Sequence, residues 1–205
     1  GLVLNTNGVS VAAANYNIVS RTVDPALNPV AQVAVPQVGV GTGYLQNEIY
    51  ENTTNAPLTV TYVVEAIGTI NGCLGDQRTI VITIDPEPVI QPGLDATVCS
   101  DNNVNLVLAT NGTSVGALNY DVLTRTVDPA LTQVVTVAIP GNAVSATYLQ
   151  NERYRNTTAL SRNVVYEVRA RGSINGCLGD VVTITMTIDP EPVMAGGLND
   201  GVCSD

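Results

Sequence analysis

Hydrophobic and polar residues alternate with a period of two along residues 59–66. The residues of the more apolar face are Val60, Tyr62, Val64 and Ala66. The next segment, residues 79–84, repeats the alternation with Ile80, Ile82 and Ile84 on one face. A period of two is typical of a β-strand that buries one face. Because the chain shows no sustained helical period, the pattern predicts an all-β protein.

The pattern returns 104 residues later, and about 59 of the 101 aligned pairs are identical. The alternating face recurs unchanged as Val164, Tyr166, Val168 and Ala170, whereas the opposite face differs between the copies. Two copies of about 100 residues have the size of one small domain each. We predict a first domain at residues 1–90, a linker at 91–98 and a second domain at 99–194. Residues 195–205 then form a linker and the start of a third copy, so we expect a segment of a longer array.

Each copy contains further short apolar segments separated by Asn-Gly, Asp-Pro and Gly-rich turns. In the first copy these segments predict strands at residues 2–5, 16–23, 30–35 and 43–51. Six or seven short strands per copy predict an antiparallel β-sandwich of the immunoglobulin type. Residues 36–43 and 140–147 differ between the copies and are interpreted as a variable loop. The candidate binding residues of this loop are Gln37, Gly39, Gly41, Gly141, Asn142 and Ser145.

The amino-acid composition excludes several classes of function. The net charge is -10, and the eight basic residues are all Arg and are scattered, which argues against nucleic acid or an anionic membrane surface as a partner. The chain has no His and no Lys, so the usual bases that activate a nucleophile are missing and we predict no enzymatic activity. No apolar stretch is long enough to span a membrane as a helix. No organic cofactor is expected.

Several motifs together resemble the PKD-like repeats of large Bacteroidota surface proteins. The residues that carry the resemblance are Tyr44-Leu-Gln-Asn-Glu48, residues 52–65, Asn71-Gly-Cys-Leu-Gly75, residues 79–88 and Val98-Cys-Ser-Asp101. The chain departs from the family pattern at Asp101, where Gly is usual, and at Tyr120-Asp121, where an aromatic pair with Trp is common. The resemblance implies tandem immunoglobulin-like modules that are exported to the bacterial cell surface, often by type IX secretion. It transfers no catalytic residue.

Three functions are compatible with this resemblance. The first is a non-enzymatic shaft of an extracellular adhesin or filament that serves adhesion or gliding, in which the partners are neighbouring repeats of the same chain. The second is a binding module that recognises glycans or a host protein through the variable loop. The third is a spacer beside the catalytic domain of a secreted enzyme. Lateral self-association of shafts, and a strand donated between chains, are further possibilities.

The four cysteines suggest disulfides in an oxidising compartment. In an immunoglobulin-like sandwich, the start of the first strand and the loop before the last strand lie at one end. This placement predicts a disulfide between Cys99 and Cys177, with Cys73 and Cys203 pairing with neighbouring repeats. The rival pairing joins Cys73 to Cys99 and Cys177 to Cys203.

The junction between the copies is rich in carboxylates. A possible calcium site is formed there by Asp85, Glu87, Asp95 and Asp101. The alternative is that these acids are solvated and that the prolines of the junction alone stiffen the linker.

Asparagines and tyrosines give two weaker signals. Asn52 and Asn156 each precede Thr-Thr and form formal glycosylation acceptors, but a structural role in a Thr-rich loop is the preferred interpretation. Tyr62 and Tyr166 fall on the predicted buried face. Tyr154, and its counterpart Tyr50, could either pack at the rim of the core or stack on a sugar ring.

Overall fold

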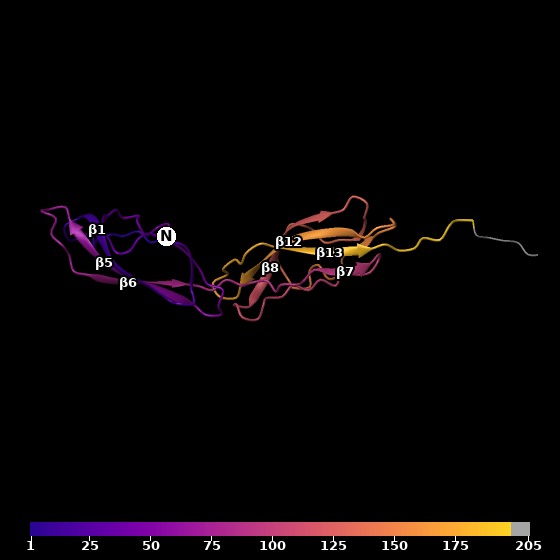
Figure 1. The fold of residues 1–205 in the computed structure, drawn as a ribbon, viewed down its shortest axis with the longest axis horizontal. Coiled ribbons are helices and arrows are strands. Elements are labelled where there is room, and N and C mark those ends of the chain that lie inside the picture. Colours follow the sequence, from indigo (N-terminus) through magenta and orange to yellow (C-terminus); the bar gives the residue numbers. More distant parts are fainter. Residues whose placement is uncertain (198–205) are drawn as a thin grey trace, which may run out of the picture. The chain divides into compact units, whose positions relative to one another are not determined.

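The computed structural model describes residues 1–197, and every regular element in this part of the chain is a β-strand (Figure 1). The all-β prediction is therefore confirmed. None of these residues belongs to a helix long and apolar enough to cross a membrane.

The strands form two matching sets, and each strand of the later set begins 104 residues after its counterpart. The first set consists of β1 (Ala13–Val23), β2 (Asn28–Ala31), β3 (Gln37–Val40), β4 (Ile49–Glu51), β5 (Leu58–Gly68) and β6 (Arg78–Ile84). The second set consists of β8 (Ala117–Val127), β9 (Thr132–Val135), β10 (Gly141–Val144), β11 (Arg153–Arg155), β12 (Arg162–Gly172) and β13 (Val182–Asp189). The remaining strand, β7 (Ala96–Cys99), precedes the second set.

The chain divides into two compact units. The first contains residues 1–89 with 110–118 and 172–179, and the second contains 90–109, 119–171 and the described residues from 180 onward. In the first set, the sheet has the order β3-β1-β5-β6, and β2 pairs with β4 in a separate ribbon. In the second set, the order is β10-β8-β12-β13-β7, and β9 pairs with β11. The pairs of the first set are antiparallel, and so are β10 with β8, β9 with β11 and β12 with β13, whereas β13 and β7 run parallel.

The core is built on the two alternating segments. Val60 and Tyr62 of β5 are buried, and so are Val164, Tyr166 and Val168 of β12. The predicted inward face is therefore confirmed in both copies. Each of these β-branched or aromatic side chains contributes about 1.5–3 kcal/mol when it is fully removed from water. β5 and β12 therefore hold their sheets together from the centre.

The weaker strand predictions are wrong in part. Residues 2–5 form no strand, although Leu4 is buried and its N–H donates to the Thr42 carbonyl at 2.9 Å. Of residues 43–51, only 49–51 form a strand, because Tyr44 and Gln46 donate their N–H groups to carbonyls three residues earlier. These local turns use backbone groups that a strand would pair with its neighbour.

Candidate functional site

A buried charged cluster is the most distinctive polar feature of each set of strands. In the second unit it joins Arg125 of β8, Glu152 before β11, Tyr154 of β11 and Tyr166 of β12. Glu152, Tyr154 and Tyr166 are fully shielded from solvent. The cluster therefore ties the ribbon β9–β11 to the five-stranded sheet.

Every donor of the cluster converges on the Glu152 carboxylate. One oxygen accepts from the Arg125 guanidinium and from the Val137 N–H at 2.9 Å. The other accepts from the hydroxyls of Tyr154, at 2.8 Å, and Tyr166, and the two hydroxyls lie 3.1 Å apart. Arg125 also donates to the Val137 carbonyl at 3.2 Å. A buried carboxylate is tolerated only when it is paired and hydrogen-bonded in this way.

The first unit contains the same cluster. Glu48 pairs with Arg21 and accepts from the Val33 N–H and the Tyr50 hydroxyl, both at 3.1 Å. The Tyr62 hydroxyl completes the set. Tyr50 is only partly buried, whereas its counterpart Tyr154 is fully buried. The packing interpretation of Tyr154 is therefore confirmed, and the alternative that its ring stacks on a sugar is excluded because the ring is fully buried.

The cluster shifts the pKa of its phenols. Burial, followed by hydrogen bonding and repulsion from Glu48, raises the pKa of Tyr62 far above its ordinary value. Burial and the Glu152 carboxylate do the same to the pKa of Tyr166. These phenols therefore stay neutral and donate to the carboxylate. In the second unit the cluster shields its carboxylate from solvent completely, as expected for a structural role.

Sequence reasoning missed this cluster, although the repeat contained the signal. Arg21 and Glu48 recur at positions 125 and 152, and both tyrosines recur as well. Identity alone does not mark the pair as buried, because Asp76 and Asp180 are also unchanged between the copies and are exposed.

A second ion-pair group lies on β8 and β12 of the second unit. Asp121 is fully buried and accepts from Arg169 at 3.0 Å, from Arg171 at 2.9 Å and from the Ala143 N–H at 3.0 Å. Burial alone would raise the pKa of Asp121. The hydrogen bonds from Arg171, Ala143 and Arg169 outweigh burial and lower the pKa to about 2.

The first unit has different residues, with different hydrogen bonds, at the same positions. Asn17 replaces the aspartate, and its amide donates to Glu65 at 3.0 Å while its oxygen accepts from the Gly39 N–H at 3.1 Å. Between the copies the first partner changes from neutral Asn to anionic Asp, and the second changes from anionic Glu to cationic Arg, so both change together. The side chain at this position therefore serves mainly to hold the neighbouring edge strand.

The predicted variable loop is mostly an edge strand, so that part of the interpretation is wrong. Gln37 and Gly39 lie in β3, which pairs with β1, and Gly141 and Asn142 lie in β10, which pairs with β8. A register shift interrupts each pairing. Gly39 has a φ of 66° and Ala143 a φ of 53°, and this irregularity removed the alternating pattern. Gly41 and Ser145 follow directly after the two strands, and ligand binding at these residues stays a prediction.

The predicted disulfide between Cys99 and Cys177 is wrong. The three cysteines among the described residues are all free thiols. β7 runs parallel to β13, so Cys99 pairs with Asp189 at the carboxyl end of β13, whereas Cys177 lies in the turn before the opposite end. A strand of this length spans far more than a disulfide can bridge. Cys203, which the rival pairing needs, lies outside the described residues, and Cys73 is an exposed thiol in the first unit.

The four candidate calcium ligands are divided between the two units. Asp85 accepts from the Asn175 amide at 2.7 Å, and the N–H of Glu87 donates to the Asn52 carbonyl at 2.9 Å. In the second unit, Asp95 accepts from the Thr185 N–H at 2.7 Å, and Asp101 pairs with Arg155 at 2.8 Å. Asp101 raises the pKa of the Arg155 guanidinium through this hydrogen bond. Calcium binding by these residues stays a prediction.

The two Asn-Thr-Thr motifs are built into the fold. Asn52 and Asn156 are buried, and their amides donate to the carbonyls of Ile84 and Ile188, both at 2.8 Å. The side-chain oxygen of Asn156 accepts from the Thr158 hydroxyl at 2.7 Å. Each motif therefore closes a turn against the last strand of its set, which confirms the structural interpretation.

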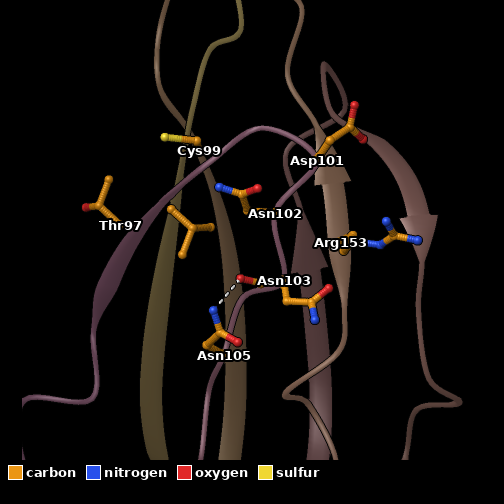
Figure 2. Close-up of a pocket in the computed structure, with 8 residues that line it drawn as sticks. Thr97, Cys99, Asp101, Asn102, Asn103, Asn105 and Arg153 are labelled. Carbon is orange, nitrogen blue, oxygen red and sulfur yellow. Dashed lines mark hydrogen bonds between the residues drawn. The ribbon is translucent and has the colours of Figure 1, made fainter.

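An open polar hollow of about 590 Å³ lies beside β7 in the second unit (Figure 2). Its lining residues are Thr97, Val98, Cys99, Asp101, Asn102, Asn103, Asn105 and Arg153. The Asn105 amide donates to the Asn103 carbonyl at 3.1 Å, as the dashed line in Figure 2 shows. The amides, the carboxylate and the guanidinium of this lining can form hydrogen bonds with a polar ligand.

Comparisons with known proteins give a family match and a structural similarity. Residues 96–192 match the family model described as a PKD-like domain. No curated protein matches the chain. Among solved structures, the chain is similar to the cadherin-like domains 1 to 4 of zebrafish RET, at 14% identity and a TM-score of 0.20. That similarity covers 87% of this chain and 42% of the other, so the chain spans less than half the length of that structure.

The family match covers β7 and the whole second set of strands. PKD-like domains are typically non-catalytic and occur in extracellular proteins. The match and the all-β fold therefore indicate a module of the extracellular structural or adhesion type.

Proposed function

We propose that the chain is a non-enzymatic segment of a large bacterial cell-surface protein, in which tandem PKD-like, immunoglobulin-like sandwiches form the shaft of an adhesin or filament. Bacteroidota proteins exported by type IX secretion are the setting that the sequence motifs suggest. The observation that carries this proposal is the repetition of one complete design. All six strands and the buried Arg–Glu–Tyr–Tyr cluster recur at the same spacing of 104 residues.

A shaft needs modules that resist unfolding and add length in equal steps. The buried cluster stabilises each copy, because it joins the ribbon of that copy to its main sheet. The net charge of -10 disfavours non-specific association between neighbouring shafts. In a repeat array the total stability is close to a sum of local terms, so copies can be added without redesign.

Small-angle X-ray scattering on chains of two, four and six copies tests the shaft. We expect the maximum dimension to rise by a constant increment per copy, in EDTA as well as in millimolar calcium. A dimension that grows only as a flexible chain would contradict the shaft. A constant increment that appears only with calcium would assign Asp85, Glu87, Asp95 and Asp101 as ligands.

A second candidate function is recognition of glycans by the second unit, which the polar hollow beside β7 favours. A glycan array tests this function directly. Specific binding that is lost in Asn102→Ala and retained when residues 140–147 are replaced by residues 36–43 would place the ligand in the hollow. Loss on the exchange alone would place it on the edge strand β10.

A further inference from the structure

The first compact unit contains two segments that belong to the second copy of the repeat. One is residues 110–116, before β8, and the other is residues 172–179, which begins with the last residue of β12. Both contact residues 85–89, the sequence Asp-Pro-Glu-Pro-Val that follows β6 in the same unit. The first copy therefore completes its packing with residues from the second.

The segment 110–116 holds the backbone of Val89 through both of its polar groups. The N–H of Val89 donates to the Ser114 hydroxyl oxygen at 2.9 Å, and the Val89 carbonyl accepts from the Asn111 N–H at 2.9 Å. Ser114 is buried, and its own N–H donates to the Asn111 side chain at 2.9 Å. The N–H of Val115 donates to the Thr54 carbonyl at 3.0 Å. A residue without a backbone N–H in place of Val89 could not make the first of these bonds.

The other segment contacts Pro88 and Asp85. A Cβ atom at Gly172 would lie 3.3 Å from Cδ of Pro88, and a Cβ atom at Gly179 would collide with the Pro88 carbonyl oxygen. Neither glycine has a positive φ, so the close approach of Pro88, and not the backbone conformation, requires glycine at these positions. The Asn175 amide donates to the Asp85 carboxylate at 2.7 Å.

The prolines restrict the conformation of residues 85–89. Pro86 and Pro88 are buried, whereas Glu87 between them is only partly buried and donates its N–H to the Asn52 carbonyl at 2.9 Å. Proline fixes φ, so an extended Pro-Glu-Pro segment loses little conformational entropy when it is bound. Residues 85–89 therefore bury two rigid rings within the first unit.

Both partners of this contact recur in the repeat. Residues 85–89 are identical to residues 189–193, and residues 172–179 differ from residues 68–75 only at Ser173. The residues of segment 110–116 that form the hydrogen bonds are Asn111, Ser114 and Val115, and they recur as Asn7, Ser10 and Val11. Each copy thus contains the sequence that is bound and the residues that bind it.

We propose that residues 110–116 and 172–179 form a binding site that recognises an extended Asp-Pro-Glu-Pro-Val segment, and that binding of residues 85–89 completes the fold of the first unit. Recognition needs an acid for the Asn175 amide, a proline ring beside Gly172 and then a residue whose backbone N–H meets Ser114. Gly179 determines the specificity, because only glycine admits the Pro88 carbonyl. The proposal goes beyond the shaft function and does not depend on it.

Hydrogen exchange of single amides, measured by NMR on the full chain, tests the role of Gly179. G179A should accelerate exchange of the Val89 and Val115 amides by at least about tenfold, because the hydrogen bonds of both amides join the second copy to the first. Amides in the centre of β12 should keep their protection.

G116A is the matched control for this variant. Space is open around the Cβ position of Gly116, and the first copy has Ala12 at the corresponding position. The exchange rates in G116A should stay within about twofold of the original rates. Equal acceleration in G116A and G179A, or none in G179A, would show that Gly179 does not determine the specificity of the site.

The variant V89P tests recognition from the side of the bound segment, because it removes the N–H donor and leaves both binding segments unchanged. We expect exchange of the Val115 amide to accelerate in V89P as it does in G179A. V193P is the matched control, because Val193 has the same place in the identical sequence 189–193 and is 67% exposed. If the Val115 amide keeps its protection in V89P, the two segments pack on the first unit without recognising residues 85–89, and the proposal is wrong.

A double-mutant cycle tests recognition of the carboxylate. D85A and N175A should each accelerate exchange of the Val89 amide. The double variant should exchange no faster than the faster of the two single variants, because both changes remove the same hydrogen bond. Accelerations that multiply in the double variant would mean that the two side chains act independently, which would overturn recognition of Asp85 by Asn175.

Discussion

Single residues explain how an acidic chain without Trp or Phe keeps its strands in register. Glu152 is fully buried, and a lone carboxylate in that place would cost several kcal/mol of folding free energy. Arg125, the Val137 N–H and two phenols offset that cost. Each partner comes from a different segment. The carboxylate therefore specifies which segments pack together, and it also stabilises their packing.

Replacing Glu152 with Gln should destabilise the chain. The neutral amide leaves Arg125 without its counter-charge in a largely buried place, and we expect a loss of about 3 kcal/mol in the free energy of unfolding. Urea unfolding followed by tyrosine fluorescence measures this loss. Glu167→Gln is the matched control, because Glu167 is exposed and should change stability by no more than about 0.5 kcal/mol. Equal effects of the two changes would refute the role of the cluster.

Asp121 should make the free energy of unfolding depend on pH in the acidic range. Its pKa of about 2 in the folded protein lies below the ordinary value of 3.8, so folding favours the ionised form. The contribution of Asp121 to the free energy of unfolding is fully present well above pH 3.8 and is lost as the pH falls through 3.8 toward 2. The shift corresponds to about 2 kcal/mol.

The variant D121N should lose this contribution at pH 7 and should show a flatter decline between pH 5 and pH 2. Asn is the residue that the first unit uses at the same position, so it fits the fold. Asp76→Asn is the control for an exposed aspartate. Urea unfolding across this pH range checks the slope, and an unchanged slope in D121N would contradict the assignment.

At the scale of elements, the edge strands β3 and β10 show how two copies reach one geometry with different residues. Both strands contain a position with positive φ, which is Gly39 in the first and Ala143 in the second. An L-residue with a side chain is strained in this region, whereas Gly is not. The period of two is broken at that position, so the alternating pattern could not reveal either strand.

Exchanging these two residues should move stability in opposite directions. Ala143→Gly should stabilise the second unit by about 0.5 kcal/mol, because it removes the strain. Gly39→Ala should destabilise the first unit by about 1 kcal/mol, although space is open around its Cβ position. The urea midpoints of the two variants check the signs. A loss of stability in A143G would mean that the side chain of Ala143 packs in a way that outweighs its strain.

At the scale of the whole molecule, the direction of β7 determines whether Cys99 can form a disulfide with Cys177. β7 runs parallel to β13, so Cys99 lies beside Asp189 and away from the turn that contains Cys177. The sequence placed both cysteines near the ends of strands but could not show the direction in which β7 runs.

The double change Cys99→Ser and Cys177→Ser should therefore leave the free energy of unfolding within about 0.5 kcal/mol of the original value. A disulfide that closed this long loop would contribute about 4 kcal/mol, which the double variant would lose. Unfolding with and without a reducing agent, together with a count of reactive thiols, separates the two cases.

The sequence by itself determined the strands with a regular alternation and the existence of two copies. Residues 59–66 and 79–84 were predictable because the buried face of a strand requires an apolar residue at every second position. The buried cluster, the direction of β7 and the edge strands were decided only by the tertiary structure. Arg125, Glu152 and Tyr166 lie far apart along the chain, and a hydrogen bond between distant segments leaves no periodic trace in the sequence.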